Sequence, residues 1–149
     1  MATALKDFRI QLSDPSLFRE QCYIDGAWVD ADDRSTVEVR DPASNERIGT
    51  VPKMGAPETR RAIEAADRAF RSWRNTTAKE RAGLLRKWFD LMMANQEDLA
   101  ILMTREQGKP LTESRGEIAY GAAFVEWYAE EAKRVYGDMI PAPASSRRI

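Results

Sequence analysis

The sequence predicts a helix-rich α+β chain in which an N-terminal antiparallel β arm is followed by three or four helices. Between residues 22 and 52, apolar residues alternate with polar ones, which is the period of a half-buried strand. After Pro52 they recur every three or four positions, which is the period of an amphipathic helix. With 149 residues the chain is long enough for one core. The sequence shows no internal repeat or low-complexity segment.

The β arm is expected to contain two hairpins, preceded by a short helix. Asp14 suits the N-cap of that helix and Pro15 suits its first position. The first hairpin turns at Asp25-Gly26, a pair that favours a type I′ turn because both residues adopt positive φ readily. The second turns within residues 41–45, which are rich in turn formers. The four expected strands are 22–24, 27–29, 35–40 and 46–51.

Two helices are expected directly after the β arm. The first starts at Pro57, a residue suited to an initial turn, and runs for roughly four turns to about Trp73. The second starts at the capping box Thr77-Ala-Lys-Glu80. In a capping box the hydroxyl accepts from the backbone N–H three residues on, and the carboxylate accepts from the backbone N–H of the cap.

Two further helical stretches follow. The polar segment Asn95-Gln-Glu-Asp98 restarts the apolar pattern, and Gly108 ends it because glycine commonly follows the last residue of a helix. The last helix is expected from about Thr112 to Tyr136, where Gly137 stops it.

The last helix has a second apolar stripe, which we call the aromatic face. It consists of Tyr120, Phe124 and Trp127, spaced at i, i+4 and i+7, with Glu131 continuing the same line. The opposite side of the helix is also apolar. The helix is therefore either buried on two sides or lines a pocket with its aromatic face. Its charged residues, Glu126, Glu130, Lys133 and Arg134, are interpreted as a solvated face.

Composition excludes several classes of function. The chain has no histidine and one cysteine, so a His/Cys zinc site, a Ser-His-Asp triad, a Cys-His pair and an intrachain disulfide are impossible within it. The net charge of −1 gives no reason to propose a nucleic-acid partner. The sequence shows no apolar run of the roughly 20 residues that span a bilayer, and residues 1–7 lack the pattern of a secretory signal. We therefore expect a cytoplasmic protein without a membrane partner.

Two features with possible chemistry are given structural interpretations. Cys22 has no activating base beside it and is interpreted as a small apolar filler. Gln107-Gly108-Lys109-Pro110 resembles a phosphate loop superficially but lacks the second glycine and the Ser/Thr, so it is interpreted as a helix end. The sequence also lacks a G-x-G-x-x-G fingerprint. We therefore assign no catalytic, cofactor-binding or metal-binding residue from the motifs.

Several segments resemble the N-terminal portion of the NAD(P)-dependent aldehyde dehydrogenase family, from about Phe18 to the end of the chain. The resembling segments are Tyr23-Ile-Asp-Gly-Ala-Trp28, Val39-Arg-Asp-Pro-Ala-Ser-Asn-Glu46, Ile48-Gly-Thr-Val-Pro52, Ala62-Ile-Glu-Ala-Ala66 and Glu106-Gln-Gly-Lys-Pro110. Within that family, residues 124–138 and 51–55 are similar to the succinate-semialdehyde dehydrogenase branch. The resemblance implies a fragment of the α/β aldehyde dehydrogenase fold. The expected divisions are 1–21 as an N-terminal arm with a short helix, 22–52 as an antiparallel β unit, 53–140 as the incomplete helical part of the cofactor-binding domain, and 141–149 as a linker toward a missing oligomerisation strand.

The resemblance also implies a reaction and a site. The complete protein would be a homodimer or homotetramer that oxidises an aldehyde such as succinate semialdehyde to the acid with NAD or NADP. The catalytic thiol, the glutamate base and the cofactor-binding strands would lie after Ile149, so the chain alone is expected to be inactive and to bind no cofactor. Tyr120, and with it Phe124 and Trp127, would line the substrate entrance. Glu106, with the backbone near Val39 and Arg40, matches a structural monovalent-cation site of some members, many of which carry Asp at that position.

An alternative from a different class remains open. The chain would then be a free-standing scaffold or interaction protein that kept only this region and binds a partner through its apolar surfaces. Residues 145–149 favour the fragment, because they resemble the approach to the family's oligomerisation strand rather than a polar tail.

Overall fold

The computed structural model describes residues 10–138 and 140–147. The expectations that concern residues 1–7 and Ile149 lie outside this range. Within it, the helices are too short or too polar for any of them to cross a membrane.

The N-terminal part contains two antiparallel hairpins, as expected. Strand β1 (Cys22–Ile24) pairs with β2 (Ala27–Val29), and β3 (Thr36–Arg40) pairs with β4 (Arg47–Pro52). In the first turn Asp25 has φ 52° and Gly26 has φ 83°, which is the pair of positive φ values that a type I′ turn requires. The short helix before the strands is a single 3-10 turn, η1 (Pro15–Leu17), with Asp14 as its N-cap.

The two hairpins form separate two-stranded sheets rather than one sheet. An isolated hairpin is marginally stable, so each needs a helix to pack against. The first lies on α1 (Ala56–Trp73). The second is tied to α3 (Gln96–Gln107), because Arg105 forms ion pairs of 3.1 Å with both Asp41 and Glu46. The β unit expected over residues 22–52 therefore consists of two hairpins that contact different helices.

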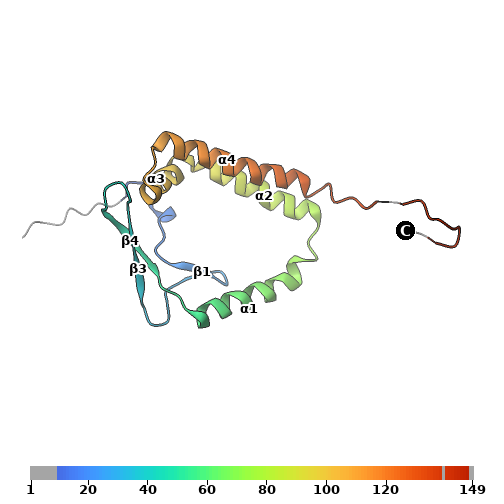
Figure 1. The fold of residues 1–149 in the computed structure, drawn as a ribbon, viewed down its shortest axis with the longest axis horizontal. Coiled ribbons are helices and arrows are strands. Elements are labelled where there is room, and N and C mark those ends of the chain that lie inside the picture. Colours follow the sequence, from blue (N-terminus) through green and yellow to red (C-terminus); the bar gives the residue numbers. More distant parts are fainter. Residues whose placement is uncertain (1–9, 139, 148–149) are drawn as a thin grey trace, which may run out of the picture.

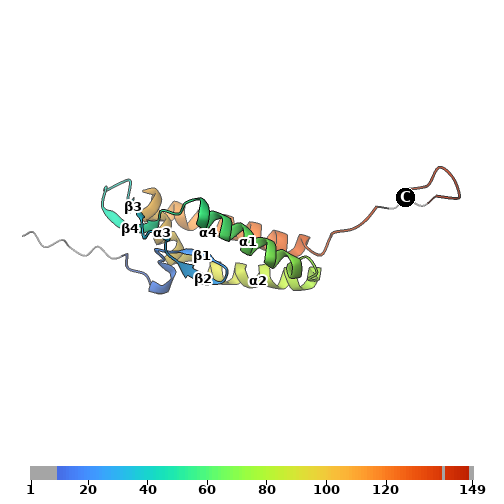
Figure 2. The same ribbon diagram turned by 90° about the horizontal axis from the view of Figure 1, so that it is seen from below.

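Helices α2 (Ala78–Ala94), α3 and α4 (Leu111–Glu131) pack together, with α2 and α4 side by side. Figure 1 shows α1 running apart from this group, joined to α2 at one end and to the strands at the other. Figure 2, turned by 90°, shows α2 and α4 again extending along the same direction. In both views the chain after α4 projects away from the helices.

The boundaries predicted at Thr77 and Gly108 are confirmed. The backbone N–H of Thr77 donates to Glu80 at 2.7 Å, and the backbone N–H of Glu80 donates to the Thr77 hydroxyl at 3.3 Å. Gly108 ends α3 in the left-handed conformation with φ 72°. The first helix also begins near Pro57 as expected, with the backbone N–H of Gly55 donating to Glu58 at 3.0 Å.

The predicted end of the last helix is wrong. Helix α4 ends at Glu131, with Ala132 as its C-cap, whereas the sequence pattern extends it to Tyr136. The side chains of Val135 and Tyr136 are 88% and 80% exposed, so neither gains burial from a further turn. Helical stability in proteins comes mainly from such packing, and β-branched and aromatic residues are weak helix formers without it.

The core of the described region is built from small side chains. Its buried apolar residues are Ala31, Ala65, Ala82, Ala100, Ile118, Ala122 and Ala129. Alanines at the contacts let helices approach closely, but each buries little apolar area. Many large apolar side chains consequently remain on the surface, including Phe70 on α1 and Trp88 on α2, each 55% exposed.

Candidate functional site

The aromatic face of α4 lies on the surface of the described chain. Tyr120, Phe124 and Trp127 are 67%, 49% and 64% exposed, whereas Ile118 and Ala122 on the other side of the helix are buried. The rings of Tyr120 and Phe124 meet edge to face with their centroids 4.9 Å apart. Helix α4 is therefore buried on one side only, and the aromatic face lines neither of the two cavities described below.

Polar contacts accompany the packing of α4 on α2 and α3. At its N-terminal end the hydroxyls of Thr104 and Ser114 lie 2.8 Å apart, and Ser114 is fully buried. Both nitrogens of the Arg115 fork donate to Glu97 on α3 at 2.7 Å. Lys109, just before α4, pairs with Glu117. Further along the helix, Arg86 of α2 pairs with Glu126 at 2.9 Å. The aromatic face points outward because the opposite side of α4, with Ile118, Ala122 and Ala129, is buried.

The Arg115–Glu97 pair shifts the titration of both groups. The Arg115 hydrogen bonds lower the pKa of Glu97, and the carboxylate in turn raises the pKa of Arg115. Both directions favour the charged forms, so the pair is ionised at neutral pH.

The Gly108 segment has a structural role, in agreement with its interpretation as a helix end. Gly108 closes α3, Lys109 pairs with Glu117, and Pro110 is the N-cap of α4. A Cβ at position 108 would lie 2.9 Å from Pro42 Cγ, so the turn of the β3–β4 hairpin packs directly on this glycine.

Cys22 occupies the first position of β1, opposite Val29, and is half-buried. Its role as a small apolar filler stays a prediction.

The structure brings Glu106 close to Val39, as the resemblance implied. Both line a cavity of about 20 Å³, together with Glu20, Ile48 and Thr50. That volume is close to the space that one water molecule requires. The Glu20 carboxylate already accepts from the backbone N–H of Thr50 at 2.7 Å.

Arg40 does not line this cavity and instead donates to the backbone carbonyl of Asn45 at 2.8 Å. In the part of the chain that the structure describes, no three Cys, Asp or Glu side chains converge as a metal site. The monovalent cation stays a prediction.

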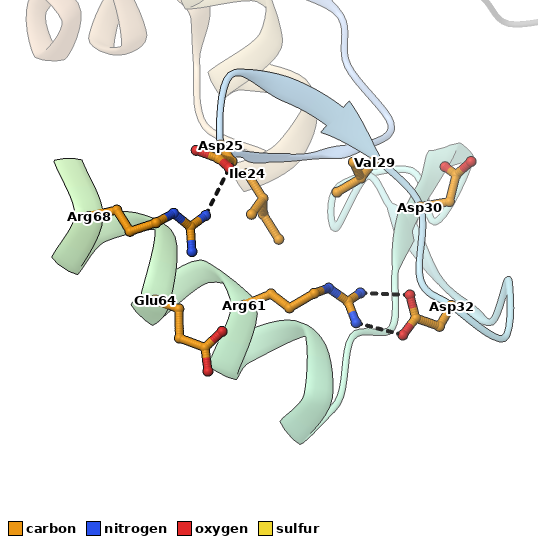
Figure 3. A pocket seen from close by; sticks show the side chains of 8 residues that line it. All are labelled: Ile24, Asp25, Val29, Asp30, Asp32, Arg61, Glu64 and Arg68. Carbon is orange, nitrogen blue, oxygen red and sulfur yellow. Dashed lines mark hydrogen bonds and ion pairs between the residues drawn. The ribbon is translucent and has the colours of Figure 1, made fainter.

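A larger cavity, of about 410 Å³, lies between the β1–β2 hairpin and α1. Figure 3 shows Arg61 and Arg68 reaching from α1 to Asp32 and Asp25 on the other side. The Arg61 fork donates to Asp32 at 2.9 and 2.6 Å, which lowers the pKa of Asp32 and raises that of Arg61. Arg68 donates to Asp25 at 2.9 Å.

Sequence reasoning did not identify this cavity. The i, i+7 spacing of Arg61 and Arg68 puts them on one helix face, which is a usable signal. Their partners lie about 30 to 40 residues away in the chain, where no local pattern points to them. Because each guanidinium is paired with a carboxylate, Arg61 and Arg68 provide ionic contacts between α1 and residues 25–32.

The model of the aldehyde dehydrogenase family matches residues 28–149. The chain belongs to this family. It is 65% identical over 140 residues to a glutarate-semialdehyde dehydrogenase of Pseudomonas aeruginosa, covering 94% of the chain and 29% of that protein. It is 56% identical over 140 residues to an NADP(+) succinate-semialdehyde dehydrogenase of Escherichia coli, again covering 94% and 29%.

Solved aldehyde dehydrogenases have the same arrangement of elements. A succinate-semialdehyde dehydrogenase from Burkholderia pseudomallei superposes with a TM-score of 0.89 at 60% identity, covering 92% of this chain and 28% of that one. The described residues therefore have the fold of an N-terminal fragment of an aldehyde dehydrogenase, as the sequence predicted. The chain spans about 29% of the length of the curated relatives it matches. These comparisons give no support to the free-standing scaffold protein.

Proposed function

We propose that this chain is part of an NAD(P)-dependent aldehyde dehydrogenase whose substrate is a short aldehyde with an acidic group at its far end. The 65% identity to a glutarate-semialdehyde dehydrogenase carries this proposal. The relatives from Escherichia coli and Burkholderia pseudomallei are named for succinate semialdehyde, which has the same two functional groups and a shorter chain. Succinate semialdehyde itself remains the first substrate to test.

Within that enzyme the chain would act as scaffold. Its helices expose large apolar side chains that in an isolated domain would be buried, such as Phe70, Trp88 and Trp127. We place the remainder of the cofactor-binding domain against these faces. The nicotinamide cofactor would accept the hydride, whereas this chain would supply rigid support around the site.

The aromatic face of α4 would line the substrate entrance. Three features support this role: the rings are exposed in this chain, they share one side of a helix, and the opposite side of that helix is buried, which fixes their orientation. Aromatic rings in a channel exclude water and discriminate substrates by shape. Tyr120, Phe124 and Trp127 would therefore select for the length of the aldehyde and would not take part in the chemical step.

The test uses the complete gene product. Its kcat/KM is measured for succinate and glutarate semialdehydes and for neutral aldehydes of the same length, each with NAD and with NADP. We expect a preference of at least about tenfold for the acidic aldehydes, because a charged group recognised by a matched site contributes more than about 1.4 kcal/mol. The 149-residue chain assayed alone should give no turnover. Equal kcat/KM values for acidic and neutral aldehydes would contradict the proposal, and so would turnover by the chain alone that alkylation of Cys22 abolishes.

A further inference from the structure

Residues 74–77 connect α1 to α2, and we call this connection the corner. Side chains from the first turn of α2 form hydrogen bonds with it. Glu80 serves α2, because it accepts from the backbone N–H of Thr77 at 2.7 Å and from the Thr77 hydroxyl at 2.8 Å. The next residue, Arg81, points back to α1.

Arg81 makes three hydrogen bonds to the end of α1. Its Nη2 donates to the backbone carbonyls of Trp73 and Arg74 at 3.3 and 3.0 Å, and its Nε donates to the Thr76 hydroxyl at 2.8 Å. The guanidinium also lies 5.8 Å from the centroid of the Trp73 ring. The last carbonyls of a helix have no partner within the helix, and a cation there is favoured by the helix dipole. One planar fork thus donates to three acceptors within residues 73–76, and the Trp73 carbonyl also accepts from the backbone N–H and the hydroxyl of Thr76.

Among the residues that the structure describes, few others contact the second half of α1. Every residue from 66 to 75 is exposed, and the buried residues of α1, Glu58 and Ala65, precede this stretch. The ion pair of Arg68 with Asp25 is itself exposed, and exposed ion pairs contribute little stability. In Figure 1, α1 diverges from α2 and α4 after the corner. The direction in which the end of α1 points therefore depends on residues 73–81.

We propose that Arg81 is a latch that sets the angle between α1 and the α2–α4 pair. It is a positioning residue, acting through Trp73, Arg74 and Thr76. When the latch is removed, residues 74–77 become a hinge, and the end of α1, with Phe70 and Trp73, no longer has a fixed position. This inference concerns the conformation of the chain and does not depend on the proposed function.

Hydrogen exchange in the 149-residue chain provides the first test. The amide groups of Arg74, Asn75 and Thr76 donate to Phe70, Ser72 and Trp73 at the corner. In Arg81→Gln we expect these amides to exchange about ten- to a hundredfold faster. The substitution removes the hydrogen bonds from the charged guanidinium to residues 73–76, so this segment opens more often. Amides within α3 and α4 should be unchanged.

Arg86→Gln is the matched control. It removes the same charge from α2, but Arg86 pairs with Glu126 of α4 and with Asp90, so exchange at the end of α1 should not change.

A distance measurement provides the second test. Spin labels on Arg60→Cys in α1 and Lys87→Cys in α2, in a Cys22→Ser background, report the spacing of the two helices. Arg81→Gln should broaden the distance distribution, and Arg81→Lys should broaden it less, because lysine keeps the charge but cannot reach three acceptors with a fork.

Three outcomes would overturn the latch. The first is an unchanged distribution with unchanged exchange in Arg81→Gln. The second is an equal effect from Arg86→Gln. The third is a uniform loss of protection across α2, α3 and α4 in both Arg81→Gln and Arg81→Lys, which would give Arg81 a general stabilising role instead.

Discussion

Gly108 ends α3 with a backbone conformation that few residues other than glycine adopt. Its φ is 72°, and the position where a Cβ would stand is 2.9 Å from Pro42 Cγ and 3.2 Å from the backbone nitrogen of Ala43. Two separate constraints therefore act on this residue, one from the helix end and one from the β3–β4 hairpin that packs on it. Nearby, Arg105 joins the same hairpin to α3 through Asp41 and Glu46.

Gly108→Ala should destabilise the chain by about 1–2 kcal/mol from the left-handed backbone alone, with a further cost from the contact with Pro42. Gly116→Ala is the control, because Gly116 lies inside α4 with nothing within 4 Å of an added Cβ. That change should stabilise the chain by about 0.5–1 kcal/mol, since alanine is the better helix former. Denaturant titration of both variants measures the two effects. A loss of stability in both would show that the conformation of Gly108 is not the cause.

At the scale of elements, a glutamate carboxylate caps the N-terminus of each of the first two helices. Glu58 is buried and accepts from the backbone N–H of Asp32 at 3.1 Å and from that of Gly55 at 3.0 Å, so it both caps α1 and attaches it to the segment after β2. Glu80 likewise caps α2, because it accepts from the backbone N–H of Thr77. The hydrogen bond from Asp32 and that from Gly55 lower the pKa of Glu58 below 4.5, its ordinary value.

This lowered pKa predicts the pH dependence of Glu58→Gln. The unfolded chain takes up the proton at higher pH than the folded chain, so ionised Glu58 stabilises the fold above about pH 4.5, and this stabilisation is lost as the pH falls through the lower folded pKa. We expect Glu58→Gln to have a lower Tm than the unsubstituted chain near neutral pH and the same Tm in strong acid. Glu64→Gln, an exposed change on the same helix, should show no such convergence. A Tm difference that stays constant on acidification would contradict the prediction.

The aromatic face of α4 provides a prediction for the complete enzyme. If Tyr120 and Phe124 line the entrance, Tyr120→Ala and Phe124→Ala should change the ratio of kcat/KM between succinate semialdehyde and an uncharged aldehyde. The expected change corresponds to about 1–3 kcal/mol for each methylene-sized contact, with little change in the KM of the cofactor. Ile63→Ala is the control, because Ile63 is an exposed apolar residue on α1 and not on α4.

The competing result has a different signature. If Phe124 is a core residue of the complete enzyme, Phe124→Ala should cost about 3–5 kcal/mol of stability and leave the substrate ratio unchanged. Measuring Tm beside kinetics separates the two cases. An unchanged ratio in both variants would remove the aromatic face from the entrance.

At the scale of the whole molecule, the described chain buries alanines and exposes its large apolar side chains. Leu84, Trp88 and Leu91 follow one line along α2, and each is more than half exposed. The aromatic face adds a second apolar surface on α4. Soluble monomers rarely expose a continuous apolar patch larger than a few hundred Å². The arrangement is that of helices that need another layer of structure to cover them.

We therefore expect the chain produced alone to bind a hydrophobic dye or to self-associate. Trp88→Gln combined with Leu84→Gln should reduce dye fluorescence, because both changes remove apolar surface from the same line on α2. Lys87→Gln, on an exposed position of the same helix, should not reduce it. Fluorescence and sedimentation of the three proteins make the comparison. A monodisperse monomer with cooperative unfolding and no dye binding would contradict this prediction and would favour a free-standing protein.

Local signals account for what the sequence determined by itself. The turn at Asp25-Gly26, the capping box at Thr77 and the helix end at Gly108 each depend on residues a few positions apart, so their chemistry can be read directly from the chain. Helical periodicity likewise put Tyr120, Phe124 and Trp127 on one face of α4. The family resemblance depended on such short segments in the right order, and the family match confirms it.

The tertiary structure alone decided the remaining features, because they depend on contacts between distant residues. Helix α4 ends at Glu131 although the sequence pattern continues to Tyr136, because the exposed side chains of Val135 and Tyr136 would gain no burial from a further turn within the described chain. The hairpins lie on different helices: Arg68 of α1 pairs with Asp25 in the first, and Arg105 of α3 pairs with Asp41 in the second. The same holds for the aromatic face: its residues share a helix by spacing, but its exposure follows from how α4 packs on α2 and α3. Spacing determines which residues share a face, and long-range packing determines whether that face is covered.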